Sequence, residues 1–354
     1  MLINNSIVEP DDPILITGGA GFIGARLLDL LLEYGFRNLR CFTRPGTEMT
    51  RVNAVVNRLG DGTRVTMLKG NLLSQEDCVD ATRDVAVIFH LAAGSGEKSF
   101  PDAFLNSVVT TRNLLEASLH HQCLKRFVNV SSFSVYSNTE NPRWRVLDEA
   151  CPVEKHPELR GDAYGFAKVK QDEIVEEYGR NFRLPYVIVR PGYVLGPGKG
   201  DITSRVGIGT FGIFLHLGGF NAIPFTFVDN CAEAIALAGL KEGVEGEVFN
   251  VVDDDLPLSR QFLRLYKQEV RRFRSIYVPH AVSWFLCCLW EKLSRWSEGQ
   301  LPLSFNRRKW HALWKMTRYS NKKIKDRLGW MPRVSMAEGL VRYFQGCRER
   351  GHDA

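Results

Sequence analysis

The sequence predicts an α/β protein in which a doubly wound parallel sheet carries a smaller, mostly helical C-terminal lobe. Two observations support this fold class. Over about the first 190 residues, short apolar runs rich in β-formers alternate with helical patterns, which is typical of a parallel sheet covered by helices on both faces. After Leu256 the pattern becomes helical and basic, and six of the seven tryptophans lie between Trp284 and Trp330. This second region predicts the separate lobe.

Six strands and three long helices are expected in the sheet-forming part. The predicted strands are residues 13–17, 38–43, 65–68, 85–91, 127–130 and 186–189. The run at 85–91 is continuously apolar, as a strand buried on both faces should be. Helical periodicity predicts helices at 24–34, 104–118 and 164–178. The segment 196–219 is rich in glycine, which favours a flexible loop over a regular element.

The composition is that of a folded intracellular protein. Hydrophobic residues make up 44% and charged residues 24% of the chain, which argues against global disorder. The eight cysteines are scattered, without Cys-x-x-Cys pairs or Cys/His metal spacing, so neither a disulfide framework nor a metal site is expected. The N-terminal residues lack the basic and apolar regions of a signal peptide. A cytoplasmic location is the resulting expectation.

The charge is concentrated in the C-terminal lobe. From Leu256 to the end there are 21 Lys+Arg and 7 Asp+Glu, a net charge of +14, whereas the rest of the chain carries −8. A basic lobe suggests an anionic substrate or an anionic surface nearby. Basic residues on solvated helix faces explain the same count equally well. No nucleic-acid motif accompanies the charge, so a nucleic-acid partner is not expected.

One apolar segment of this lobe allows two interpretations. Residues 281–290 read AVSWFLCCLW, which is too short to span a bilayer. A buried helix is the expected structure. A peripheral contact with a membrane surface is the less favoured alternative, because Lys292, Arg295 and the basic run 307–309 follow.

The strongest local motif is TGGAGFIG at residues 17–24, between the first predicted strand and the first predicted helix. In this context Gly18 permits a tight turn, Gly21 lets the backbone approach a pyrophosphate, and Gly24 lets helix and strand pack closely. The free N–H groups and the helix dipole favour a phosphate there. The motif predicts a dinucleotide-binding Rossmann domain over residues 1–190, with 225–255 returning to it. Residues 191–224 and 256–354 then form the substrate-binding lobe.

The residue after the second strand bears on the choice of cofactor. Cofactors with a free ribose 2′-hydroxyl usually meet an Asp or Glu at this point, whereas a 2′-phosphate is accommodated by an Arg. Arg44 follows the strand and no acid precedes it on that strand. NADP is therefore favoured, with NAD as the alternative, unless Arg44 points to solvent as arginines commonly do.

The catalytic motif is YGFAK at residues 164–168. Positions i and i+4 of a helix share one face, so the phenol of Tyr164 can lie beside the ammonium of Lys168. A nearby cation favours the phenolate and lowers a tyrosine pKa from about 10, which suits a proton donor and acceptor near neutral pH. The spacing alone is weak evidence, since surface helices often carry it by chance.

The neighbouring strand ends strengthen the prediction. Ligands bind at the carboxyl ends of the strands in open α/β sheets, and Ser132 follows the fifth predicted strand, where its hydroxyl could bind the reacting oxygen. Ser131 and Ser134 are expected to cap or bond local backbone. His90 precedes small residues that leave room for a cofactor, and a packing or hydrogen-bonding histidine is favoured over a proton shuttle.

Together these motifs resemble the extended short-chain dehydrogenase/reductase superfamily, also called the epimerase/dehydratase family. The resemblance runs over nearly the whole chain, through TGGAGFIG at 17–24, HLAA at 90–93, RPGYVLGPG at 190–198, FVDNCAEAI at 227–235, GEVFN at 246–250 and LGWMP at 328–332. It implies Tyr164 as acid/base, Lys168 on the nicotinamide ribose, and Ser132 on the substrate oxygen. It implies a cofactor site made of Gly18, Gly21, Phe22, Ile23, Gly24, Arg44, Asn71, Leu72, Leu91, Ala92, Ala93, Tyr164, Lys168, Pro191 and Gly192.

The resemblance also narrows the reaction. Sugar dehydratases of the family carry Thr-Asp-Glu where this chain has Ser132, Phe133 and Ser134, so a dehydratase is not expected. The RPGY at 190–193 is more similar to the 3β-hydroxysteroid dehydrogenases and carbonyl reductases than to the epimerases. The expected activity is therefore NAD(P)-dependent interconversion of a secondary alcohol and a ketone. The alternatives are a nucleotide-sugar epimerase and a non-enzymatic dinucleotide sensor, and a homodimer is a family expectation.

Overall fold

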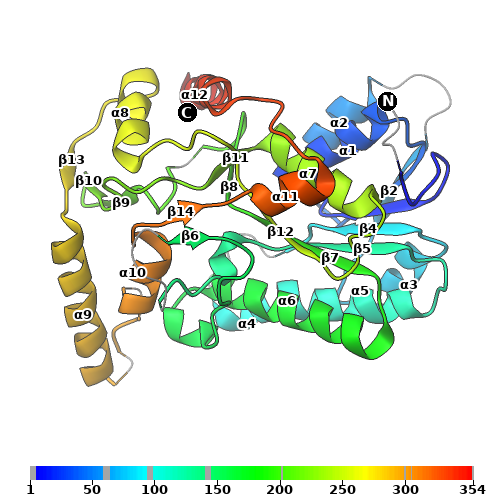
Figure 1. The fold of residues 1–354 in the computed structure, drawn as a ribbon, viewed down its shortest axis with the longest axis horizontal. Helices are drawn as coiled ribbons and strands as arrows, with labels where there is room; N and C mark the ends of the chain where they lie inside the picture. The colour runs from blue at the N-terminus through cyan, green and yellow to red at the C-terminus, as the bar shows by residue number, and fades with distance from the viewer. Residues whose placement is uncertain are drawn as a thin grey trace.

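The computed structural model describes residues 5–58, 64–93, 99–139, 145–200, 202–298, 300–303 and 305–352. At its centre lies a seven-stranded sheet of order β12-β7-β5-β4-β1-β2-β3, in which all neighbouring strands are parallel (Figure 1). The strands are β1 Ile14–Thr17, β2 Asn38–Thr43, β3 Arg64–Lys69, β4 Val87–His90, β5 Arg126–Val130, β7 Tyr186–Pro191 and β12 Val248–Val251. The predicted doubly wound α/β fold is confirmed.

The strand order defines where a ligand can enter. The chain leaves β1 toward β2 and β3 on one side, and then returns past β1 to β4 and β5 on the other. Crevices form at the carboxyl ends of strands where the order reverses in this way. All six predicted strands are present, and β12 joins them beside β7 through the pairing of Phe249 with Val189.

Helices cover both faces of the sheet (Figure 1). One face carries α1 Phe22–Glu33, α2 Thr50–Val56, α7 Val228–Leu240 and α11 Lys322–Leu328. The other carries α3 Gln75–Thr82, α4 Phe100–Ala103, α5 Thr110–Leu119 and α6 Ala163–Phe182. Two hydrophobic clusters fill the layers, one centred on Leu27, Phe89 and Ile235 and the other on Ile88, Leu115 and Val175. The sheet therefore rests between two separate apolar cores.

The helix predicted at 104–118 has an irregular first half. Residues Phe104–Val109 form a π-helix that joins α4 to α5. Single π-turns of this kind occur frequently at functional sites. Here the wide turn carries Asn106 to the rim of a cavity described below.

The C-terminal lobe is mostly helical, as predicted. Its helices are α8 Ser259–Glu269, α9 His280–Trp296, α10 Arg307–Leu313 and α12 Met336–His352. Short strand pairs connect the two regions, namely β8 Tyr193–Leu195 with β11 Phe225–Phe227 and β6 Val146–Leu147 with β14 Arg318–Tyr319. Short 3₁₀ turns occur at Phe133–Val135 and Pro157–Arg160. No helix in the described part of the chain is long and apolar enough to cross a membrane.

The prediction of a flexible loop over 196–219 is wrong in part. Residues β9 Gly207–Thr210 and β10 Ile213–His216 form an antiparallel hairpin, and β10 also pairs with β13 Ser275–Tyr277. The turn between them has Phe211 and Gly212 at positive φ, the geometry that suits the twist of a tight hairpin. The glycines serve close strand contacts there as well, since a Cβ on Gly207 would collide with the carbonyl of Leu215.

The prediction of a buried helix at 281–290 is also wrong. The segment is helical, but only Ser283, Cys287, Glu291 and Ser294 of α9 are buried. The large apolar side chains lie on the opposite, exposed face. Periodicity shows that a helix has an apolar face and does not show whether another element covers it.

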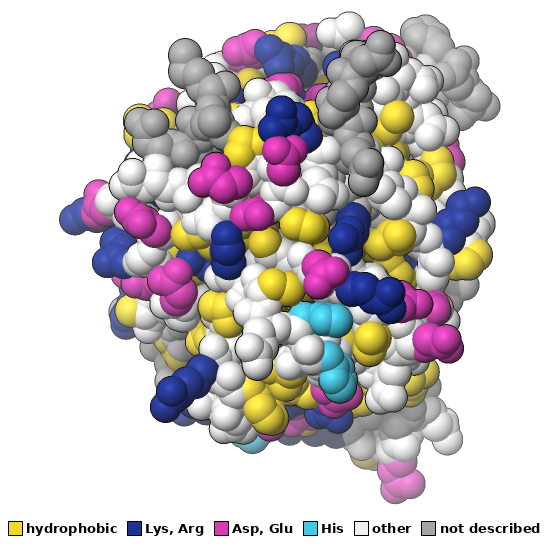
Figure 2. Space-filling model, turned by 90° about the vertical axis from the view of Figure 1, so that its right-hand side faces the viewer, with side chains coloured by type: hydrophobic (Ala, Val, Ile, Leu, Met, Phe, Trp, Pro, Cys, Tyr) yellow, Lys and Arg dark blue, Asp and Glu magenta, His cyan; other side chains and the backbone are white. Residues whose placement is uncertain are grey.

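The end of the molecule farthest from α9 has a mixed surface. Figure 2 shows this face, on which basic, acidic and hydrophobic side chains are interspersed without a large area of one kind. Scattered hydrophobic side chains of this sort are normal on a protein surface. The exposed face of α9, where large apolar side chains gather, therefore differs from the mixed surface at the opposite end.

Candidate active site

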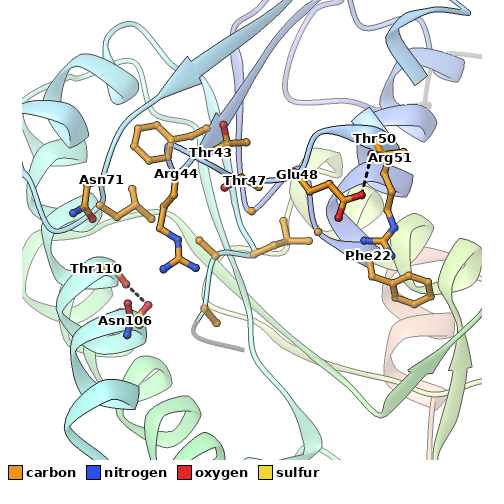
Figure 3. A pocket seen from close by; sticks show the side chains of 18 residues that line it. Phe22, Thr43, Arg44, Thr47, Glu48, Thr50, Arg51, Asn71, Asn106 and Thr110 are labelled. Carbon is orange, nitrogen blue, oxygen red and sulfur yellow. Dashed lines mark hydrogen bonds between the residues drawn. The ribbon is translucent and has the colours of Figure 1, made fainter. Parts of the chain in front are cut away.

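A cavity of about 660 Å³ opens at the carboxyl ends of β1, β2 and β4 (Figure 3). Nine of the predicted cofactor residues line it: Gly18, Gly21, Phe22, Arg44, Asn71, Leu72, Leu91, Ala92 and Ala93. Thr43, Thr47, Glu48, Thr50, Arg51, Asn106 and Thr110 also line the cavity and were not foreseen. The cavity lies where the strand order reverses, as the fold requires of a ligand site.

The glycine turn forms one wall of this cavity. Gly18 has φ +69°, and a Cβ on it would approach the backbone nitrogen of Ala92 to 2.9 Å. A Cβ on Gly24 would collide with the carbonyl oxygen of Gly18, so α1 can pack against the turn only without a side chain there. Gly21 is the N-cap of α1, whose first N–H groups and dipole favour an anion. A turn that excludes side chains and ends at a helix N-terminus fits the pyrophosphate of a dinucleotide.

Charged groups of both signs line the cavity beyond the end of β2. Arg44 extends from the end of β2 into the cavity, and Glu48 and Arg51 stand across from it (Figure 3). The Glu48 carboxylate accepts a hydrogen bond from Thr50 Oγ1 at 2.9 Å. Two cations suit a 2′-phosphate, whereas a carboxylate suits a free 2′-hydroxyl. Glu48 lies four residues beyond Arg44, in the loop after β2, and was not among the residues predicted from the end of that strand.

Six predicted cofactor residues do not line the cavity: Ile23, Gly24, Pro191 and Gly192, and also Tyr164 and Lys168, which are described below. Gly24 supports the turn from below, and Ile23 packs against the hydrophobic core. Pro191 ends β7, and Gly192 donates its backbone N–H to Val251 O at 2.9 Å. These last two residues lie at the same carboxyl edge of the sheet, on the side of β5 away from β1.

His90 is completely buried at the end of β4. Its Nδ1 lies 2.8 Å from Thr17 Oγ1 and its Nε2 lies 2.8 Å from Thr111 Oγ1. Burial, reinforced by the positive charge of Lys168, lowers the pKa of His90 to about 3. The imidazole is neutral at physiological pH, and the expected hydrogen-bonding role of His90 is confirmed.

The surrounding hydrogen bonds define the tautomer of His90. Thr111 Oγ1 donates to Ser107 O at 2.5 Å, so it can only accept from its other neighbours. It therefore accepts from His90 Nε2 and from Gln171 Nε2, the latter at 2.7 Å. His90 Nδ1 is then the acceptor and receives the hydroxyl proton of Thr17. Thr17 Oγ1 in turn accepts the backbone N–H of Ala92 at 3.2 Å, on the cavity wall.

The same chain of hydrogen bonds ends at Lys168. The ammonium donates to Val130 O at 2.8 Å and to Gln171 Oε1 at 2.8 Å, and Lys168 is almost fully buried. Because Val130 is the last residue of β5, these contacts hold the charge of Lys168 at the carboxyl edge of the sheet. Gln171 was missed in the sequence, although its position one turn after Lys168 on α6 was a usable signal.

Tyr164 and Ser132 lie at the same edge. Tyr164 is the second residue of α6 and is 42% exposed, one helical turn before Lys168. Ser132 follows β5, and its Oγ accepts the Ser134 N–H at 3.2 Å. This local bond was expected of Ser131 or Ser134, and the structure shows it at Ser132 instead. It uses an acceptor site of the hydroxyl, so the Ser132 proton can still be donated to a substrate oxygen.

A second polar network lies beneath the edge. Arg190 Nε donates to Asp172 Oδ2 at 3.0 Å and Arg190 Nη1 donates to Tyr136 OH at 3.2 Å. Tyr136 OH donates to Asn250 Oδ1 at 2.7 Å, and burial raises the pKa of Tyr136 to about 12. These buried contacts tie α6 to β7 and β12 and keep the helix that carries Tyr164 against the sheet.

The family comparison covers most of this architecture. A model described as the NAD dependent epimerase/dehydratase family matches residues 14–251. An uncharacterized UDP-glucose epimerase of Bacillus subtilis is 28% identical over 253 residues, which are 67% of this chain and 76% of that protein. A 3β-hydroxysteroid dehydrogenase/decarboxylase of Arabidopsis thaliana is 24% identical over 95% of this chain and 80% of its own. D-erythronate dehydrogenase of Cupriavidus necator is 32% identical over 51% of this chain and 56% of its own.

Solved structures agree on the fold. The UDP-glucuronic acid 4-epimerase of Bacillus cereus, in complex with UDP-glucuronic acid and NAD, has a TM-score of 0.71 at 22% identity. The match covers 96% of this chain and 99% of that one. The UDP-glucose 4-epimerase of Thermus thermophilus, in complex with NAD, has a TM-score of 0.68 at 20% identity, over 95% and 99% of the two chains. At these identities the likeness is one of fold.

Proposed function

We propose that this chain, which belongs to the NAD dependent epimerase/dehydratase family, interconverts a secondary alcohol and a ketone by hydride transfer, with Tyr164 as the acid/base. The chain is an enzyme of the extended short-chain type, like the epimerases and dehydrogenases to which it is similar. This finding argues against the alternative of a non-enzymatic sensor.

One observation carries the proposal. The hydrogen bond from Lys168 Nζ to Val130 O joins the catalytic face of α6 to the end of β5, two residues before Ser132. The side chains of Tyr164, Lys168 and Ser132 thus start from adjoining backbone at the edge where a nicotinamide ring would reach from the cavity. These are the residue types that a proton transfer to a carbonyl oxygen needs.

Each residue then has a separate role. In the direction of reduction the Tyr164 hydroxyl donates its proton to the carbonyl oxygen, and in oxidation the phenolate takes the alcohol proton. The Ser132 hydroxyl donates a hydrogen bond to the same oxygen and orients it. Lys168, held by Val130 and Gln171, stabilises negative charge on that oxygen and on the phenolate. The bound nicotinamide dinucleotide supplies or accepts the hydride.

We further propose that separate regions of the chain bind the cofactor and the substrate. Cofactor binding is assigned to residues 1–190 and 225–255, and substrate binding to 191–224 and 256–354. All residues that line the 660 Å³ cavity lie between Gly18 and Thr110, which supports the first assignment. The basic composition of the second region favours an anionic substrate. NADP is the proposed cofactor because Arg44 and Arg51 line the cavity, with NAD as the alternative because Glu48 does.

A cytoplasmic location is part of the proposal. All eight cysteines are free thiols, and six of them are buried. Thiols without disulfides are typical of proteins in a reducing compartment.

Native mass spectrometry and a tyrosine variant test the function. The purified chain should carry, or bind when it is added, a nicotinamide dinucleotide whose mass separates NADP from NAD. Tyr164→Phe should lower the rate of ketone reduction by at least about 100-fold, the usual contribution of a general acid, while dinucleotide affinity stays within about threefold. Tyr178→Phe on the same helix is the control, because Tyr178 bonds Glu116 far from the strand edge. Undiminished reduction by Tyr164→Phe would disprove the proposal.

The epimerase alternative has one observation in its favour. The chain aligns over 67% of its length with a protein named as a UDP-glucose epimerase. An epimerase re-reduces its own intermediate, so added dinucleotide would not be consumed as substrate is converted. Net, stoichiometric oxidation of NADPH or NADH by a ketone supports the dehydrogenase, whereas conversion of a UDP-sugar without net consumption supports the epimerase.

A further inference from the structure

Helix α9 has its polar side packed inward and its apolar side exposed. Ser283, Cys287, Glu291 and Ser294 are its buried residues. On the opposite side lie Val282, Phe285, Leu286, Leu289, Leu293 and Trp296, which are 40–82% exposed. The spacing of these residues, 282, 285, 286, 289, 293 and 296, keeps all of them within one side of the helix. We call this set the α9 apolar face.

Two further exposed apolar side chains precede α9. Ile276 and Tyr277 on β13, directly before the helix, are 54% and 48% exposed. In Figure 1, α8, β13 and α9 follow one another along a single end of the molecule, with α9 at its outer edge. Several large apolar side chains exposed together on one side of a helix mark an interaction site, because monomeric proteins rarely leave large apolar patches uncovered.

Cations lie at the same end of the molecule as the α9 apolar face, on α8 and the segment that follows it (Figure 1). Arg260, Arg264, Lys267 and Arg272 line an open pocket of about 500 Å³ beside β13, together with Leu263 and Phe273. Glu269, the carboxylate of α8, pairs with Arg348 instead, at 3.0 Å. Within the described ranges these four cations form no ion pair with a carboxylate. Lys292 is exposed on α9 itself.

We propose that this end of the molecule docks on the surface of an anionic lipid bilayer. Helix α9 lies parallel to the membrane with the α9 apolar face in the boundary between headgroups and acyl chains. The cations of α8 and its following segment contact the lipid phosphates. An amphipathic helix with Trp, Phe and Leu on one face and basic residues beside it is the type that binds in this way.

The charge distribution favours a bilayer over a second copy of this chain. A two-fold dimer through α9 would bring the same patch of each copy together. Such a dimer would bring together two copies of the end that carries these four cations, and like charges oppose association. An anionic membrane complements both the apolar face and the cations. The helix has 17 residues and is about 25 Å long, so it would rest on the bilayer rather than cross it.

The inference does not depend on the proposed reaction and can be tested without a substrate. The full-length chain is sedimented with vesicles of phosphatidylcholine alone and of phosphatidylcholine with phosphatidylglycerol. We expect binding to the anionic vesicles, a blue shift of the tryptophan fluorescence contributed by Trp296 of the α9 apolar face, and weaker binding at high salt. Phe285→Glu with Leu289→Glu should reduce binding at least about tenfold, because charges would replace two apolar side chains that the proposal places in the bilayer.

Matched variants separate the contribution of the α9 apolar face to vesicle binding from the contribution of the cations. Val341→Glu changes an apolar side chain that is 61% exposed on α12, and it should leave vesicle binding unchanged. Arg264→Gln with Arg272→Gln should weaken binding to anionic vesicles and leave any binding to neutral vesicles unchanged. Absence of vesicle binding by the unmodified chain overturns the proposal. So does a dimer in lipid-free solution that dissociates when Leu289→Glu is introduced, since that result would assign the face to a second copy.

Discussion

Helices α7 and α9 have similar apolar content and opposite surroundings. Every residue of α7 except Asp229 is buried, because the helix packs between α1 and strands β4, β5 and β7. In α9 four of the 17 residues are buried, and most of the large aromatic and aliphatic side chains are exposed. The comparison shows that apolar content predicts a helix with a face to be buried, but does not predict what buries that face. The cover is another element of the same chain for α7, and for α9 we propose a membrane surface.

The largest effect is expected from the buried member of this pair. Ile235→Ala in α7 removes a side chain that is fully buried in the core against the sheet. We expect the free energy of unfolding to fall by about 2–4 kcal/mol, as for other large-to-small changes in cores. Urea denaturation followed by circular dichroism measures it. A loss below about 0.5 kcal/mol would mean that α7 is not covered as the structure shows.

A somewhat smaller effect is expected at Gln171, the buried link between Lys168 and Thr111. Gln171→Ala should lower the free energy of unfolding by about 1–3 kcal/mol, because it leaves polar groups of both neighbours without this partner. It should also lower kcat and shift the pH profile of kcat, while KM changes less, since Gln171 positions the ammonium without touching substrate. Lys170→Ala, whose exposed side chain pairs with Glu173, is the control. Equal pH profiles of Gln171→Ala and the unmodified enzyme would refute the positioning role.

The pH dependence of the free energy of unfolding tests how completely His90, at the edge of the sheet, is buried. The pKa of His90 is about 3 in the folded chain, against about 6.5 when unfolded. Below pH 6.5 the unfolded chain binds a proton that the folded chain excludes, so the free energy of unfolding falls by about 1.4 kcal/mol for each pH unit down to about pH 3. His90→Gln should be less stable at pH 7 and should lose less stability on acidification.

A matched histidine serves as the control for this test. His120 is exposed, and His120→Gln makes the same substitution at the surface for comparison with His90→Gln. His216, whose pKa burial lowers to about 4, contributes a similar slope that both variants retain. If His90→Gln and the unmodified chain have the same slope between pH 6.5 and 4, then His90 is not excluded from water.

The smallest effect is expected on the exposed face. Leu289→Ala in α9 truncates a side chain that is 44% exposed, and it should change the free energy of unfolding by less than about 0.5 kcal/mol. The measurement is the same urea denaturation used for Ile235→Ala, so the two helices are compared directly. A loss of 2 kcal/mol or more would show that this face is covered within the chain after all.

Much of the candidate site could be predicted from the sequence because its parts are local. The glycine turn at residues 17–24 and the Tyr164–Lys168 pair each depend on spacing within one strand–helix unit, and strand ends of a parallel sheet meet at one edge by construction. Glu48 and Gln171 were missed because their roles depend on contacts outside a single strand–helix unit. Glu48 reaches the cavity through a loop, and Gln171 acts through Thr111 on a helix about 60 residues away.

The sequence by itself determined the alternation of strands and helices, the glycine turn and the face shared by Tyr164 and Lys168, since all three follow from periodicity and backbone sterics. Only the tertiary structure decided which elements cover one another. It made 207–216 a hairpin through the pairing of β10 with β13. It buried α7 and left the α9 apolar face exposed. Burial depends on neighbours distant in sequence, and no local pattern specifies them.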